Sequence, residues 1–290
     1  MRSLAIVPLL LALAPSAMRA DGPHAQTPAA TPRAEPQSDE LAPLCPALPA
    51  SVENHRFAAG EQLRFHLDLY GADVGSFQID LEPPPRAERE RVQLLIHARA
   101  HTSAFVSTNL GDYSGFAISR IGPGLAPLST HEEVDEGSTH WLHEATFPPR
   151  QGKLDVHASK NGEPAPLSLS ATPSARDLLS AFLTLRAAPL TAGTQLCAEA
   201  FGGRRIWKMT GTIGPHEQLE TPLGKFDTVR IDLLSARVDE PRTTRAAHFW
   251  ITADERRLPI AALAEIKGKT IRAQLESASG RGWSLGKKAN

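Results

Sequence analysis

Alternation of apolar and polar residues recurs along most of this chain, and this period of two constrains its fold more than any other feature. Residues 61–70 carry Leu63, Phe65, Leu67 and Leu69 at every second position. Successive side chains of a β-strand point to opposite faces, so this segment predicts a half-buried strand. The turn Gly71–Asp73 and a returning pattern at Val74–Leu81 predict a hairpin with a bulge at Gly75.

The same alternation predicts about a dozen short strands, bounded by glycine and proline. The first strand after the hairpin is predicted at residues 91–100. The later ones are Tyr113–Arg120, Leu128–Val134, Thr139–Phe147, Lys153–Ser159, Gln195–Phe201, Ile206–Ile213, Thr228–Val238, Arg245–Thr252, Leu258–Ile266 and Thr270–Glu276. Strands that follow one another without intervening helices pair antiparallel. The expected fold is mainly β: a curved antiparallel sheet, half-barrel or barrel.

One segment, Ser174 to Arg186, has the period of a helix. Ser174 and Asp177 are spaced as a capping box, in which Asp replaces the usual Glu. The apolar positions that follow predict one amphipathic helix, and Pro189 lies just beyond its end. We expect the curved sheet to wrap over this helix.

The N-terminus has the order of a secretory signal peptide. Arg2 precedes the apolar run Leu4–Leu13, and small residues follow up to Ala20. The alternative, a membrane anchor, needs roughly 20 apolar residues, about twice this run. We therefore expect a cleaved signal peptide at 1–20, an exported periplasmic or secreted protein, and no transmembrane segment in the mature chain.

Three further boundaries follow from composition. Residues 21–56 are rich in Pro and Ala and have no hydrophobic period, which predicts a disordered linker. Residues 57–276 contain the predicted strands and helix and form a single β domain. Residues 277–290 are expected to be a polar tail.

Cys45 and Cys197 are the only cysteines. An oxidising compartment favours one disulfide between them, which would fasten the end of the linker to a strand. The alternative is two unrelated buried thiols. Neither cysteine belongs to a Cys-x-x-Cys motif, so the expected role is structural.

The formal net charge of −1 and the absence of a basic stripe argue against nucleic acid as a partner. A possible metal site lies among His131, Glu133, His140 and His143 on neighbouring predicted strands. Zinc needs three or four converging ligands, whereas His140 and His143 face opposite ways on a strand. We therefore expect solvated histidines, no metal and no cofactor.

No recognised hydrolase or nucleotide-binding motif occurs. Asp177, Ser180 and Arg186 could supply a base and an anion clamp, but the simpler interpretation is an acidic first turn, a small helix residue and a basic last turn. Asp254 opens a stretch that is most simply a polar turn. No catalytic residue is assigned.

Four ordered motifs resemble a known family. They are Phe57–Leu63 leading to Gly71 and Gly75, the helix Asp177–Arg186 followed by Pro189 and Gly193, Thr221–Phe226, and Phe249–Pro259. In this order they resemble the bacterial exported family catalogued as domain of unknown function 3108. The resemblance implies an exported β protein and supplies no catalytic residue. The motif positions without a known role are Gly60, Glu61, Asp177, Ser180, Arg186, Gly224, Trp250, Asp254 and Pro259.

These observations favour a non-enzymatic periplasmic binding or envelope-assembly protein for a lipid, a lipoprotein or a polysaccharide. Two alternatives stay open. One is an envelope enzyme of unrecognised type that uses polar residues such as Asp177, Arg186 or Asp254. The other is a structural or protein-interaction module.

Overall fold

The predicted first hairpin forms β1 (Gln62–Leu69) and β2 (Ala72–Glu82). In β1, Leu63, Phe65 and Leu67 are buried. The register of the pair shifts opposite Gly75, which confirms the predicted bulge. A side chain at Gly75 would collide with the backbone of His101, so glycine allows β2 and the next strand to approach closely there.

The structure is a computed structural model that describes Cys45, Val52, His55 and residues 57–266 and 269–286. The predicted signal peptide (1–20) and most of the predicted linker (21–56) lie outside the described residues. Val52, inside that linker, is buried in the main hydrophobic core. The folded domain therefore includes a residue that composition assigned to the linker.

Strands form most of the described chain. After β2 they are β3 (Leu94–Thr102), β4 (Tyr113–Ile121), β5 (Pro127–Glu136), β6 (Thr139–Thr146), β7 (Lys153–Lys160), β8 (Glu163–Pro164), β9 (Leu167–Ser170), β10 (Arg176–Asp177), β11 (Gln195–Gly202), β12 (Arg205–Thr221), β13 (Gly224–Arg237), β14 (Thr244–Thr252), β15 (Pro259–Ile266), β16 (Lys269–Gly280) and β17 (Trp283–Gly286). The helices are α2 (Ala104–Leu110) and α3 (Leu178–Ala187), with 3₁₀ turns η1 (Arg86–Glu88) and η2 (Pro123–Leu125).

All these strands belong to one sheet, built from two antiparallel series. Strands β1 to β7 each pair with their neighbours in sequence, and β7 also pairs with β8 and β9. Strands β11 to β17 form the second series, and a two-residue parallel contact adds β10 to β11. Strand β1 pairs with β2 on one side and with β16 on the other, so it joins the two series.

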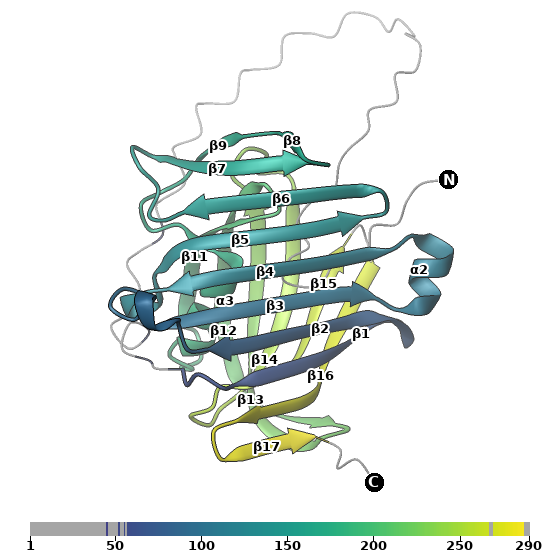
Figure 1. The fold of residues 1–290 in the computed structure, drawn as a ribbon. Coiled ribbons are helices and arrows are strands. Elements are labelled where there is room, and N and C mark those ends of the chain that lie inside the picture. Colours follow the sequence, from purple (N-terminus) through teal and green to yellow (C-terminus); the bar gives the residue numbers. More distant parts are fainter. Residues whose placement is uncertain (1–44, 46–51, 53–54, 56, 267–268, 287–290) are drawn as a thin grey trace, which may run out of the picture.

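The sheet curves without closing, because no pairing in the described residues joins β9 to β10 or β11. The strands of the first series cross the front of the molecule, and those of the second run steeply behind them (Figure 1). Buried side chains of both series meet on α3, where Phe182 contributes to the same core as Phe65 and Phe249. The predicted mainly β half-barrel around a helix is confirmed.

Helix α3 differs from the prediction in its start and in its burial. Asp177, not Ser174, is the N-cap, and its carboxylate accepts hydrogen bonds from the N–H groups of Leu179 and Ser180. Every residue of α3 except Leu185 is buried. Because both series of strands surround the helix, it is an interior helix and not an amphipathic one.

Several segments have regular structure that the sequence did not predict, among them α2, the short strands β8 and β9, and residues 277–286. Helix α2 begins after Ser103, whose hydroxyl accepts a hydrogen bond from Val106 N. Residues 277–286, expected to be part of a polar tail, form the end of β16 and strand β17. Ala278, near the end of β16, is buried in the main hydrophobic core, so the sheet continues past residue 276.

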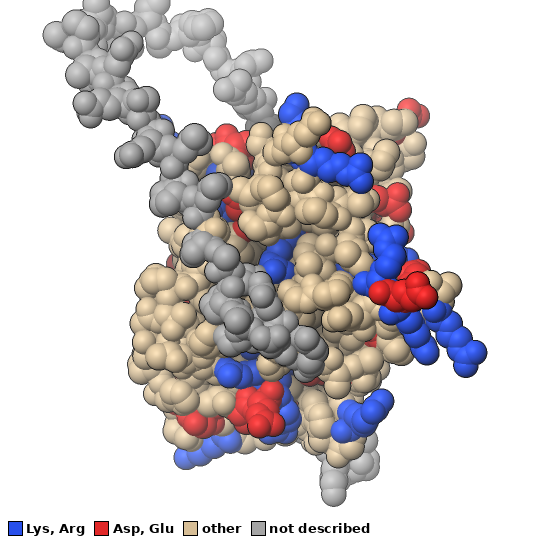
Figure 2. All heavy atoms as spheres, turned by 90° about the vertical axis from the view of Figure 1, so that its left-hand side faces the viewer, with Lys and Arg blue, Asp and Glu red and all other residues tan. Residues whose placement is uncertain are grey.

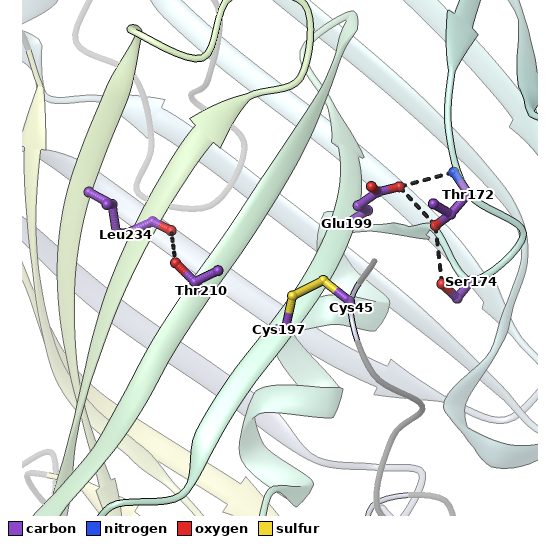
Figure 3. Close-up of a disulfide and its surroundings, with 7 residues drawn as sticks. All are labelled: Cys45, Thr172, Ser174, Cys197, Glu199, Thr210 and Leu234. Atoms are coloured by element: carbon purple, nitrogen blue, oxygen red, sulfur yellow. Dashed lines mark hydrogen bonds between the residues drawn. A yellow bond between two sulfur atoms is a disulfide. The ribbon is translucent and has the colours of Figure 1, made fainter. Parts of the chain in front are cut away.

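The predicted disulfide is confirmed. Cys45 and Cys197 are bonded, with their Cα atoms 5.2 Å apart and 152 positions between them in sequence. On β11, Glu199 lies near the disulfide and accepts hydrogen bonds from Thr172 N (3.0 Å) and Thr172 Oγ1 (2.8 Å) (Figure 3). The N-terminal segment and the loop before β10 are thus both fastened to β11, beside the open edge of the sheet.

Candidate functional site

Several of the family-motif positions meet around Arg186 at the C-terminal end of α3. Its guanidinium donates to both carboxylate oxygens of Glu61, at 2.6 and 3.1 Å. It also donates to the carbonyl oxygens of Arg256 (3.0 Å) and Arg257 (2.9 Å), and the ring of Phe57 lies 4.6 Å from it. Arg186 is completely buried. We call these five residues the Arg186 lock, because they tie α3 to the start of β1 and to the β14–β15 turn.

The other motif positions have local structural roles. Gly60, with φ 98°, precedes Glu61, and its N–H donates to Leu81 O at 2.7 Å. Asp254 accepts a hydrogen bond from Thr252 Oγ1 at 2.7 Å in the β14–β15 turn, which confirms the predicted polar turn. The remaining positions are Ser180 in the first turn of α3, Gly224 at the start of β13, Trp250 in β14 and Pro259 at the start of β15.

Asp177 and Arg186 lie at opposite ends of α3, roughly 13 Å apart along a helix that rises 1.5 Å per residue. The structure therefore does not bring them together as a base and an anion clamp. Asp177 instead belongs to a second cluster, in which its second carboxylate oxygen accepts a hydrogen bond from Ser119 Oγ at 2.7 Å. Burial raises the pKa of Asp177, and its hydrogen bonds oppose that shift.

Glu132 is the second buried carboxyl group of this cluster. It points inward from β5 and is 2% exposed. Burial and, to a smaller extent, the charge of Asp177 raise the pKa of Glu132 to about 8, against the opposing effect of a hydrogen bond from the Gly203 N–H. The Glu132 side chain is consequently protonated at neutral pH, which avoids the cost of burying its charge.

His143 faces Glu132 in the register of β5 and β6, with Nδ1 3.9 Å from Glu132 Oε2. Burial and, to a smaller extent, the charge of Arg204 together lower the pKa of His143 to about 4. Neither ring nitrogen has a hydrogen-bond partner among the described residues. The expectation that His143 is a solvated strand position was wrong, because its position in β6 points to the interior.

The other candidate metal ligands lie on the outer face. His131 contacts Glu133 (2.8 Å) and Glu144 (3.0 Å), and His140 contacts Asp135 (2.8 Å). His140 and His143 lie on opposite faces of β6, as their spacing predicts. Within the part of the chain that the structure describes, no three such side chains are placed to hold a metal ion.

A hollow of about 290 Å³ lies where β3 begins and β4 ends. We call it the mouth hollow, and its lining residues are His55, Phe57, Gln93, Leu94, Ile121 and Leu125. Phe57 belongs to the Arg186 lock, so the lock holds one wall of the hollow. Arg176 Nη1 donates to Leu125 O at 2.5 Å and holds a second wall. The lining is mainly apolar, and Gln93 is an exposed polar side chain within it.

A second space, between the two series of strands and α3, is much smaller. It measures about 20 Å³ and is lined by aromatic and small apolar residues that include Phe65, Phe182 and Phe249. This volume is about that of one water molecule. Of these two spaces, only the mouth hollow has room for part of a ligand.

The model of the family described as "Protein of unknown function (DUF3108)" matches residues 64–276, which contain most of the described sheet and the whole of α3. The chain belongs to the DUF3108 family. No curated protein matches the sequence. The family has no stated activity, so membership accounts for the ordered motifs without assigning them a chemical role.

One solved structure indicates the fold that this DUF3108 protein shares. A β-barrel-like protein of the DUF1849 family from Brucella abortus is similar with a TM-score of 0.54 at 10% identity, over 78% of this chain and 99% of the other. Two more distant structures are described as "a putative exported protein with YmcC-like fold" from Bacteroides fragilis (TM-score 0.34, 9% identity, 78% and 98% covered) and "a putative lipoprotein" from Parabacteroides distasonis (0.32, 9%, 78% and 97%). No helix among the described residues of the DUF3108 chain is long and apolar enough to cross a membrane.

Proposed function

We propose that this DUF3108 protein is a non-enzymatic binding protein of the bacterial periplasm, and that the mouth hollow receives an apolar part of its ligand. The observation that carries the proposal is the hollow itself. Its volume of about 290 Å³ is close to the lower end of small-molecule sites, roughly 300–1,000 Å³. Its mainly apolar lining with one exposed amide is also typical of such sites.

The positions of the polar residues favour binding over catalysis. Asp177 caps α3, Arg186 is occupied by Glu61 and two carbonyl groups, and Asp254 is hydrogen-bonded within a turn. An enzyme that used these three side chains would have to release them from contacts that stabilise the fold. A binding protein needs no such release, because the Arg186 lock supports the wall of the hollow through Phe57.

Gln93→Trp tests this proposal. Gln93 is exposed at the hollow, so an indole can fill the space without disturbing the core. We expect the folded protein to bind N-phenyl-1-naphthylamine, an uncharged fluorescent apolar probe, and Gln93→Trp to reduce the affinity at least tenfold. Fluorescence titration measures both affinities.

The matched control is Gln218→Trp, an equally exposed glutamine on β12. It should bind the probe like the unchanged protein. Native mass spectrometry of the protein taken from its own periplasm should also show a bound species. No probe binding and no bound species would contradict the proposal and favour a protein-interaction module.

A further inference from the structure

Basic side chains occur in the segment of chain that leads directly to Gln93 and Leu94 of the mouth hollow. Strand β2 ends at Glu82, and the segment that leads to β3 contains Arg86, Arg89 and Arg91, all of them exposed. Gln93 of the hollow follows Arg91 by two positions. Figure 2 looks onto this side of the molecule and shows basic side chains, with acidic ones among them, projecting in a group at the right.

Two of the three arginines in this segment, Arg86 and Arg91, have side chains that bind no other described residue, whereas the neighbouring arginines do. Arg89 Nε donates to Pro84 O at 3.3 Å, and Arg120 of β4 pairs with Glu88 at 2.9 Å. Arg86 and Arg91 make no side-chain hydrogen bond or ion pair among the described residues. The segment and its neighbour Arg120 together carry four arginines against two glutamates, Glu88 and Glu90.

An apolar hollow next to free guanidinium groups matches one class of ligand. Guanidinium groups bind carboxylate and phosphate oxygens through paired N–H donors. Alkyl chains enter apolar hollows because burial removes their surface from water. A ligand with both parts would place its chain against Leu94 and Ile121 and its anionic end near Arg91.

The volume further limits the ligand. At about 290 Å³, the hollow lies near the lower limit for small-molecule sites, which suits one alkyl chain better than the two chains of a phospholipid. We propose that the ligand of the mouth hollow is a single-chain amphiphile with an anionic head, either a carboxylate or a phosphate, held by Arg86 and Arg91. This inference rests on the proposed function, because it needs the hollow to be a binding site.

Three probes with the same alkyl chain separate the head group from the chain: dodecanoate, dodecyl phosphate and dodecanol. Isothermal titration calorimetry at pH 8 and low salt, below the micellar concentrations, gives their affinities. We expect at least one of the two anions to bind tenfold or more tightly than dodecanol. That advantage should shrink as salt is added, since exposed charges are screened within about 10 Å at 0.1 M. A preference between the two anions identifies the head group.

The double variant Arg86→Gln/Arg91→Gln should remove this preference and leave the affinity for dodecanol unchanged. Arg150→Gln/Arg281→Gln is the control, since both residues are exposed and lie outside the segment. Equal affinities for all three probes, or a preference that survives the first double variant, would overturn the inference while the proposed function stands. Failure of all three probes to bind would remove the proposed function as well.

Discussion

Arg186→Met should destabilise the protein by about 3–5 kcal/mol, the usual cost of removing one partner from a buried ion pair. The substitution leaves the Glu61 carboxylate buried without its cation, and it leaves the carbonyl groups of Arg256 and Arg257 without their donor. Urea denaturation followed by circular dichroism measures the loss. The stability of Arg186→Lys should lie between that of Arg186→Met and that of the unchanged protein, because an ammonium group cannot reproduce the paired donation to Glu61.

The matched control for this experiment is Arg256→Met. Arg256 also forms an ion pair, at 2.5 Å from Asp254, but both side chains are more than two-fifths exposed. Exposed pairs contribute less than about 1 kcal/mol, so this variant should be nearly as stable as the unchanged protein. If Arg186→Met cost no more than Arg256→Met, the lock would not hold α3 as described.

Glu132→Gln should stabilise the protein at neutral pH, by on the order of 3 kcal/mol at pH 7. Burial raises the pKa of Glu132 to about 8 in the folded state, whereas an unfolded chain has the ordinary value of 4.5. Folding at pH 7 therefore requires this carboxyl group to take up a proton. Glutamine is already neutral, and its carbonyl oxygen can still accept the hydrogen bond from Gly203.

The pH dependence gives the sign of this effect. A raised folded-state pKa contributes stability that is complete below pH 4.5 and is lost as the pH rises through 8. The two proteins should therefore be similarly stable near pH 4 and differ increasingly up to pH 8. Urea denaturation at pH 4, 6 and 8 tests this. Glu163→Gln, at an exposed position of β8 where the side chain forms no ion pair with a described residue, is the control and should show no such trend. A constant difference at all three pH values would contradict the assigned protonation.

The alternation of apolar and polar residues predicted the strands, because each strand's own sequence decides which side chains face the core. Alternation identified the long strands of both series, and the position of Gly75 identified the bulge. The start of α3 was misplaced because Ser174 and Asp177 can both cap a helix, and only the pairing of β10 with β11 shows which one does. That pairing joins residues more than twenty positions apart, so no local pattern contains it.

The candidate site was harder to predict than the fold. The Arg186 lock combines positions that the family motifs had singled out, although nothing in their spacing showed that Glu61 and Arg186 would pair. Strand β5 has few apolar residues on either face, so its alternation is too weak to show that Glu132 points inward. The mouth hollow forms where the ends of two strands meet His55 and Phe57, and such a long-range contact leaves no periodic signal in the sequence.

The position of β1 has a consequence for how the chain reaches this fold. Arg272 of β16 donates to Asp68 of β1 at 2.6 Å, across 204 positions of the sequence. Because synthesis proceeds from the N-terminus, one edge of β1 waits unpaired until almost the whole chain has emerged. Such distant pairings slow folding and leave an edge open to aggregation in the meantime. Strand β16, the last long strand to be synthesised, therefore joins the two series of strands by pairing with β1. Until then, the unpaired edge of β1 in the nascent chain must be kept from pairing with other chains.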